Sequence, residues 1–367
     1  MSRAARIALV SACGCLLIAS AVLASGRQER ESSLEALVEQ VSEAGAPGVL
    51  LLVRDGDGTT TTVRGIAAGD RPLRASDRFR VGSVTKTFVA VVVLQLVADG
   101  RVGLDDTVER WLPGLVPAGS EITVRQLLSH TSGLYDYVED PRVLATSAQD
   151  PGSAWSPREL VSIALEHPSP FDPGERYAYS STNYLLLGLI VEAATQRPLA
   201  QTLRARVFEP LALERTTFDP RYVRGPYVHG HRSPSHHGVV TGSARDTSGE
   251  AATWAWAAAA IVSTADDLSR FFASLLGGRV LRPSLLREME TLVPGGALRY
   301  GLGLAAFPTP CGDAWGHTGN AQGTVTVAWN RRDASRQVVL VVNTYPLTPE
   351  LEAAVRELEI AAFCEEA

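Results

Sequence analysis

The sequence is nearly without lysine: Lys86 is the only one, beside 33 arginines. Arginine cannot release its proton in any usable pH range, whereas a buried lysine can. Lys86 is therefore a candidate base before any motif is considered. The alternative at this point is that Lys86 is an accidental remnant of a strong bias against lysine.

Positive charge is also short overall. The 367 residues carry a formal net charge of −6, which argues against the concentrated basic face that binds nucleic acid. An anionic substrate would have to be held by local donors, because the overall field repels it. Repeats and low-complexity tracts are missing too, and 45% hydrophobic with 20% charged residues is the mix of an ordinary globular protein.

Cysteine is scarce as well. Of the four cysteines, Cys13 and Cys15 lie in the apolar N-terminal segment, which leaves Cys311 and Cys364 for the mature chain. An even pair in an exported protein predicts a disulfide, and closing about 50 residues should stabilise the fold by roughly 4 kcal/mol. Two cysteines so far apart are a poor metal site, and we expect neither a metal nor a cofactor.

The N-terminus has the order of a processing segment. Arg3 and Arg6 precede an apolar run, and Val22-Leu23-Ala24 provides a cleavage site, so residues 1–24 are predicted to be a secretory signal and the protein to be secreted. Two alternatives stay open: an uncleaved anchor helix that leaves the protein on the membrane facing outside, and lipoprotein processing at Cys13.

Residues 25–367 are predicted to form one domain in which strands at both ends enclose a helical middle. The pattern predicts one sheet assembled from the two termini, terminal helices over one of its faces, and a mostly helical lobe inserted over about residues 105–275. Residues 225–251 are expected to be a long loop. The elements predicted are helices over 33–43, about 83–98 and 348–363, and strands over 48–54, 59–66, 300–307, 324–330 and 337–343.

The predicted central helix opens with Ser83-Val84-Thr85-Lys86. Ser83 and Lys86 are three residues apart and share a helical face. Ser83 would lie at the helix N-terminus, where backbone N–H groups favour a developing negative charge. Lys86, in an apolar interior, would have its ammonium form destabilised and could take the serine proton. The alternative is a serine N-cap beside a lysine that extends to solvent.

Two further clusters carry candidate chemistry. In the first, from Tyr177 to Tyr184, Tyr179 could pass a proton to a leaving group if a neighbouring cation lowered its pKa. In the second, Gly316-His317-Thr318-Gly319-Asn320, small residues would let backbone N–H groups approach a substrate as in an oxyanion hole. Each cluster alone is also compatible with a purely structural role.

Taken in this order and spacing, the three motifs resemble those of the serine D-alanyl-D-alanine carboxypeptidases and class C β-lactamases, the penicillin-recognising serine hydrolases. The likeness extends over nearly all the mature chain. It includes the segments 77–80, 127–134, 262–268 and 300–304. It implies the β-lactamase/transpeptidase-like α/β (α+β) fold, with an antiparallel sheet flanked by helices. It also implies a disulfide between Cys311 and Cys364.

The resemblance implies a role for each motif residue. Ser83 would be the acylated nucleophile, Lys86 its base, and Tyr179 the proton shuttle. The N–H groups of Ser83 and Asn320 would form the oxyanion hole. The residues expected to line the substrate pocket are His317, Thr318, Gly319, Ser181 and Trp254, with His317 and Thr318 helping to hold a substrate carboxylate.

Two positions depart from the family pattern. The tyrosine motif normally reads Tyr-x-Asn, and here its third place is Ser181. Members with a His-Thr-Gly triplet tend to carry an arginine after Gly-Leu-Gly-Leu to bind the terminal carboxylate, and here that place is Ala305. Losing such a charge-assisted pair should cost one to two decades in substrate binding, about 1.5–3 kcal/mol.

The sequence therefore predicts a secreted, monomeric serine hydrolase. The favoured activity is that of a D-alanyl-D-alanine carboxypeptidase on peptidoglycan-type peptides, with β-lactams as covalent ligands. An esterase, a D-amino-acid amidase or a β-lactamase on the same scaffold is the alternative, and a non-catalytic binding protein is a third. An α/β-hydrolase is set aside, because no Gly-x-Ser-x-Gly elbow occurs.

Other polar residues are expected to be structural. His130 is predicted to be a hydrogen-bonded core residue, and Asp105-Asp106 a turn or cap. Four histidines fall in the predicted loop, and without supporting acidic or cysteine spacing they are not expected to bind a metal. These are His229, His231, His236 and His237.

Overall fold

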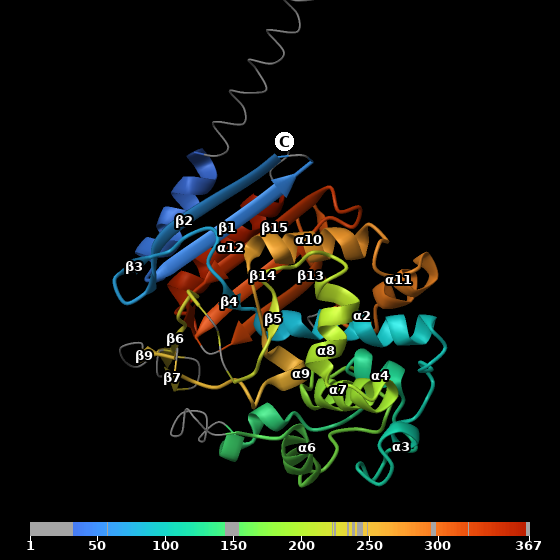
Figure 1. Cartoon of the computed structure of the whole chain (residues 1–367). Helices are drawn as coiled ribbons and strands as arrows, with labels where there is room; N and C mark the ends of the chain where they lie inside the picture. The colour runs from blue at the N-terminus through green and yellow to red at the C-terminus, as the bar shows by residue number, and fades with distance from the viewer. Residues whose placement is uncertain are drawn as a thin grey trace, which may run out of the picture.

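A computed structural model of the chain (Figure 1) describes residues 32–364. The exceptions are residues 57, 144–153, 222, 224, 233–234, 237–238, 241–244, 248, 295–298 and 322. The predicted signal over residues 1–24 lies outside the described residues. In the part of the chain that is described, no helix has both the length and the apolarity needed to cross a membrane.

An eight-stranded antiparallel sheet joins the two ends of the chain, as predicted. β1 from the N-terminal region pairs with β15 from the C-terminal region, with Leu51 opposite Leu340. β15 is buried along its whole length, because helices cover both faces of the sheet. In spatial order the strands are β11 (Arg299–Tyr300), β12 (Ala305–Thr309), β13 (Gly312–Ala321), β14 (Thr324–Asn330), β15 (Arg336–Val342), β1 (Gly48–Asp55), β2 (Gly58–Ala68) and β3 (Arg71–Pro72).

The two terminal helices pack on one face of this sheet (Figure 1). Leu34 and Val38 of the helix over residues 32–43 share a core with Leu351 and Leu358 of α12 (Pro349–Cys364). The disulfide between Cys311 and Cys364 ties the end of α12 to the β12–β13 turn, with a Cα–Cα distance of 5.4 Å. The amphipathic helix α10 (Ala265–Leu276) packs against β14 and β15.

The helical lobe surrounds α2 (Thr85–Ala98), whose side chains are buried on nearly every side. Ring stacking continues the core outward from this helix: the ring of Phe88 stacks on that of Phe271, with 3.7 Å between the two ring centroids. Further helices in the described part of the chain are α3 (Val108–Trp111), α4 (Val124–Leu128), η2 (Tyr137–Glu139), α6 (Pro157–Leu165), α7 (Thr182–Thr195), α8 (Leu199–Leu203), η3 (Arg204–Phe208), α9 (Trp256–Ala259) and α11 (Pro283–Glu290).

Short strands connect the lobe to the sheet. The three-stranded sheet β4-β10-β5 is built from β4 (Phe79–Arg80), β10 (Ile261–Ser263) and β5 (Thr217–Phe218). A second small sheet, β16-β6-β9, is built from β16 (Thr344–Tyr345), β6 (His231–Arg232) and β9 (Arg245–Asp246). A two-stranded pair joins β7 (Ser235–His236) to β8 (Val239–Val240).

Three local predictions were wrong. The segment 225–251 is not one irregular loop, because β6 to β9 lie within it. The expected strand over 300–307 is two strands, since Gly303 has a left-handed φ of +80° and turns the chain. The strand β13 was missed, because its glycines lower strand propensity, although pairing on both edges fixes it.

Candidate active site

The nucleophile and base candidates meet where the chain enters α2. Ser83 lies in η1 (Gly82–Val84), one turn of 3-10 helix that comes directly before Thr85, the first residue of α2. The amine Nζ of Lys86 lies 3.0 Å from Ser83 Oγ and also 3.0 Å from the carbonyl oxygen of Ala258. Ser83 is partly exposed while Lys86 is completely buried, so a substrate can reach the hydroxyl but water cannot solvate the amine.

This burial changes the chemistry of Lys86. Desolvation lowers the pKa of its amine from 10.5 to about 7, and the carboxylate of Asp136 works in the opposite direction. A large share of Lys86 is therefore neutral at neutral pH and able to accept a proton from the serine.

Two glycines let strand β13 approach the serine turn at backbone distance. Gly82 has φ +55°, and a Cβ there would lie 2.7 Å from the backbone nitrogen of Asn320. A Cβ on Gly319 would lie 2.0 Å from the Val81 carbonyl oxygen and 2.9 Å from the Ser83 nitrogen. Only glycine fits at either position. The contact holds the amides of Ser83 and Asn320 near each other, which an oxyanion hole requires.

Tyr179 lies over the same pair. Its ring centroid is 4.9 Å from Lys86 Nζ, and its hydroxyl forms a hydrogen bond with Ser83. The shuttle role expected of Tyr179 required a neighbouring cation to lower its pKa. That requirement is not met, because burial holds the pKa of Tyr179 well above 10. Tyr179 therefore stays protonated and can act as a neutral hydrogen-bond donor rather than as a phenolate.

His130 supports Tyr179 from below, as the core residue that was predicted. The two ring centroids are 4.2 Å apart. His130 Nδ1 accepts hydrogen bonds from the Ser180 N–H (3.2 Å) and the Asn183 amide (3.1 Å). Burial and the nearby Lys86 keep the pKa of His130 well below 6.5, so the ring is neutral.

His317 is a buried ring whose two nitrogens both make hydrogen bonds. Its Nδ1 donates to the Thr318 carbonyl, and Tyr300 Oη donates to its Nε2 at 3.0 Å. Burial and Lys86 lower its pKa to about 3, so the ring is neutral near pH 7. A neutral ring, with both nitrogens already bonded, cannot hold a carboxylate by charge. Its part in holding a substrate carboxylate together with Thr318 stays a prediction.

The other expected pocket residues are spread around this centre. Thr318 is partly exposed on β13, and Asn320 is exposed two residues later. Ser181 is buried at the N-terminus of α7, where its N–H donates to the Asp136 carboxylate. The carbonyl of Trp254 accepts from Tyr137 Oη at 2.6 Å, which anchors the segment leading to Ala258.

Asp136 is the functional candidate that the sequence did not indicate. Its side chain accepts from the N–H groups of Val138 and Ser181 and interacts electrostatically with Lys86. Burial raises its pKa above 3.8, although Lys86 opposes this. A Tyr-Asp-Tyr sequence has no spacing that separates a site carboxylate from a turn residue, so only the fold reveals its position.

Two of the four histidines in the predicted loop are held in structural contacts. His229 Nδ1 lies 2.8 Å from Asp246, and His231 Nδ1 lies 3.0 Å from the Asn343 carbonyl oxygen. The side chain of His236 and all of His237 lie outside the described residues. Within the described ranges, no cluster of three or more His, Cys, Asp or Glu could hold a metal ion.

Comparison with known proteins identifies one family over nearly the whole chain. The family model Beta-lactamase matches residues 34–362. Esterase EstB of Burkholderia gladioli is 30% identical over 84% of this chain and 90% of its own. Penicillin-binding protein 4* of Bacillus subtilis is 30% identical over 52% of this chain, and the match spans only 42% of that protein. Among solved structures, a D-stereospecific amidohydrolase from Streptomyces sp. superposes with a TM-score of 0.83 at 35% identity, covering 92% of this chain and 99% of that one.

Proposed function

The chain belongs to the beta-lactamase family and is a serine hydrolase of that family, and from this premise we propose that it hydrolyses amides and esters of D-amino acids that keep a free amino group. The observation that supports this choice is the charge of the site. Neither Ala305, buried where the family pattern has an arginine, nor the neutral His317 offers a cation to a substrate carboxylate. The esterase and the D-stereospecific amidohydrolase among the similar proteins have names that fit this choice.

Acylation would begin at Ser83. Neutral Lys86 takes the hydroxyl proton as Ser83 Oγ bonds to the substrate carbonyl carbon, across the 3.0 Å contact. The carbonyl π bond opens, and its oxygen takes the negative charge against the N–H groups of Ser83 and Asn320. Donors fixed in place before the reaction stabilise such an oxyanion without reorganisation.

Tyr179 would then protonate the leaving group. As the C–N or C–O bond breaks, the amine or alkoxide takes the Tyr179 hydroxyl proton. Lys86, whose Nζ lies 4.9 Å from the Tyr179 ring centroid, then gives Tyr179 the proton that it took from Ser83. Water then hydrolyses the acyl-enzyme by the same steps. It loses a proton to Lys86 or Tyr179, its oxygen bonds to the acyl carbon, and the bond to Ser83 Oγ breaks as that oxygen takes the proton back.

Substrate preference tests this proposal. We expect kcat/KM for D-phenylalanine amide or methyl ester to exceed that for an N-acylated peptide ending in D-alanyl-D-alanine by at least about tenfold, because the site has lost a charge-assisted carboxylate contact. Spectrophotometric or chromatographic assays of both classes on one preparation measure it. A preference for the carboxylate-bearing peptide would overturn the proposal.

Asp136 would receive the free amino group of the substrate. Replacing Asp136 with Asn should raise KM for D-phenylalanine amide about 10- to 100-fold, the cost of a lost charge-assisted contact, and leave KM for its N-acetyl derivative unchanged. Asp136 also stabilises the Lys86 ammonium. The variant should therefore lower the pKa of Lys86 and move the acid limb of the pH profile of kcat/KM to lower pH.

Glu139→Gln is the matched control, because it removes a carboxylate from the same turn and Glu139 is exposed. We expect it to leave both KM values and the pH profile as in the wild type. If Asp136→Asn harmed the free and N-acetylated substrates equally, Asp136 would be a structural residue and the amine-binding proposal would fail.

A D-alanyl-D-alanine carboxypeptidase that binds β-lactams is the second candidate. The penicillin-binding relative and the partly exposed hydroxyl of Thr318, which can donate to a carboxylate, favour it. Export through the N-terminal segment and a monomeric state stay predictions, and detection of the protein in the culture medium would test the first.

A further inference from the structure

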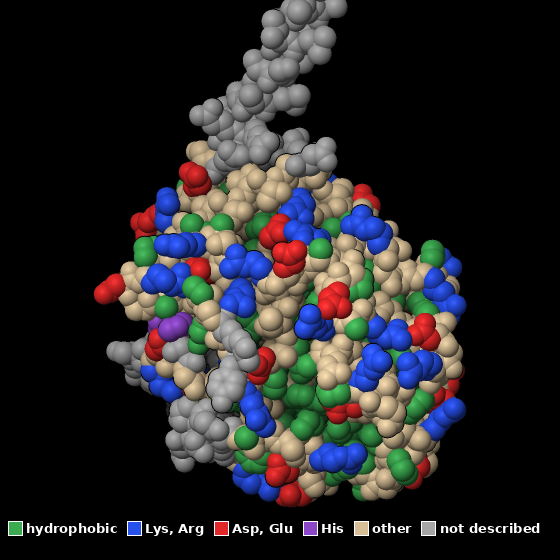
Figure 2. All heavy atoms as spheres, viewed as in Figure 1, with side chains coloured by type: hydrophobic (Ala, Val, Ile, Leu, Met, Phe, Trp, Pro, Cys, Tyr) green, Lys and Arg blue, Asp and Glu red, His purple; other side chains and the backbone are tan. Residues whose placement is uncertain are grey.

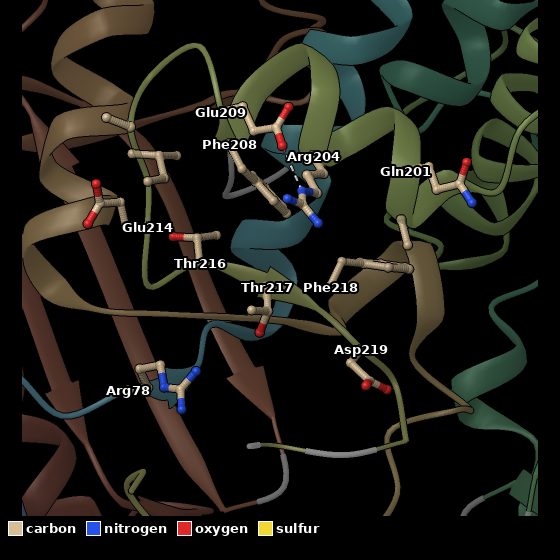
Figure 3. Close-up of a pocket in the computed structure, with 13 residues that line it drawn as sticks. Arg78, Gln201, Arg204, Phe208, Glu209, Glu214, Thr216, Thr217, Phe218 and Asp219 are labelled. Atoms are coloured by element: carbon tan, nitrogen blue, oxygen red, sulfur yellow. Dashed lines mark hydrogen bonds and ion pairs between the residues drawn. The ribbon is translucent and has the colours of Figure 1, made fainter. Parts of the chain in front are cut away.

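A cavity lies away from the catalytic cluster (Figure 3). Its volume is about 810 Å³, and it shares no lining residue with the site described above. Figure 2 shows hydrophobic side chains gathered in a hollow over the region of β5, α8 and α9. The residues that line the cavity are Arg78, Ala200, Gln201, Arg204, Phe208, Glu209, Ala212, Leu213, Glu214, Thr216, Thr217, Phe218 and Asp219.

The walls of the cavity are mainly apolar and rigid. Phe208 is buried, and its ring lies 6.0 Å from that of Phe88 on α2. Phe218 stands on β5, which is paired along one edge to β10. Thr216 is fixed by hydrogen bonds to Ser263 (2.7 Å) and Asp267 (2.8 Å). These walls suit a flat or branched hydrophobic group.

Arg78 brings a positive charge to this space. Its neighbours are paired: Asp77 binds Arg71 at 2.9 Å, and Arg80 bonds to the Glu250 carbonyl. Among the described residues, by contrast, no ion pair or side-chain hydrogen bond of Arg78 is found, and its Nε is enclosed without a partner. Figure 3 shows its guanidinium pointing into the cavity.

The lining also carries three acidic residues, and two of them have partners other than Arg78. Glu209 is paired with Arg204 at 2.8 Å. Asp219 accepts from the Arg221 N–H at 3.0 Å and interacts electrostatically with Arg80. Glu214 lies at the margin, on the far side from Phe218 (Figure 3). Arg215 adds a second positive charge near Arg78, and together with burial it lowers the pKa of Arg78.

We propose that this cavity binds a small amphipathic carboxylate, with its anionic group on Arg78 and its hydrophobic group between Phe208 and Phe218. A guanidinium is a bidentate donor for a carboxylate, and the Arg78 side chain is partly buried at the cavity. Mostly apolar walls with a few polar groups are typical of small-molecule sites. The site is independent of the Ser83 chemistry, so its occupant does not have to be a substrate.

Calorimetric titration with 4-phenylbutyrate tests this site, and the uncharged 4-phenylbutanamide is the matched ligand. We expect the carboxylate to bind the wild type and Ser83→Ala alike and the amide to bind at least about tenfold more weakly. Arg78→Gln should remove that difference by weakening the carboxylate about 10-fold or more. Arg158→Gln, the same charge change at an exposed position on α6, should have no effect.

Phe218→Ala gives an independent check on the apolar wall and should weaken both ligands. Thermal unfolding of each variant separates lost binding from lost folding. No saturation below about 10 mM, equal binding by Arg78→Gln, or loss of binding after Ser83 is acylated would each overturn the proposal. Because the titration does not depend on turnover, its failure leaves the proposed hydrolase function untouched.

Discussion

Replacing Lys86 with Met should lower kcat/KM for a D-amino-acid ester by about 10²- to 10⁴-fold, the usual contribution of a positioned base. Methionine keeps an unbranched side chain of similar length in the buried channel but has no proton acceptor for Ser83. No other lysine exists to replace it. Stopped-flow measurement of ester cleavage gives the rate directly, and a loss below about tenfold would mean that Lys86 is not the base.

The same variant should fold at least as well as the wild type. In the folded protein the pKa of Lys86 is lowered from 10.5 to about 7, so the unfolded state binds more protons between these two values. The free energy of unfolding of the wild type should therefore rise with pH across this window, by up to about 1.4 kcal/mol per pH unit. Lys86→Met should lack this rise, and denaturant titrations from pH 6 to 10 measure it.

Replacing Gly319 with Ala should lower kcat/KM by about 10²- to 10³-fold, the measured cost of an oxyanion-hole donor. The new Cβ would lie 2.0 Å from the Val81 carbonyl oxygen and 2.9 Å from the Ser83 nitrogen. Both neighbours are backbone atoms, so β13 and the serine turn must move apart and the two amides must separate. We expect the loss in kcat, since the donors act on charge that develops in the transition state.

Gly249→Ala is the matched control, because a Cβ there meets nothing within 4 Å. It should leave kcat and KM unchanged. If Gly319→Ala kept full kcat while folding normally, β13 would not provide part of the oxyanion hole, and the assignment of Asn320 would have to be withdrawn.

The sequence predicted the parts of this site that depend on helical spacing and hydrophobicity. Ser83 and Lys86 share one turn, and an apolar helix around Lys86 was enough to expect a buried amine. Contacts between residues far apart in the sequence could not be predicted: nothing in the sequence indicates that Asp136 interacts with Lys86. The neutral state of His317 depends on burial and on Lys86, which is more than 200 residues away along the chain. The strand β13 depends on its two neighbours, because its glycines favour no strand alone.

The central claim is that Ser83 carries the acyl group, and rapid-quench mass spectrometry tests it most directly. The protein is mixed with the p-nitrophenyl ester of D-phenylalanine, quenched in acid within milliseconds and digested. The masses of the resulting peptides are then measured. We expect one phenylalanyl group on the peptide that contains Ser83 in the wild type, and no adduct in Ser83→Ala. Full turnover without an adduct, or an adduct that persists in Ser83→Ala, would contradict the account.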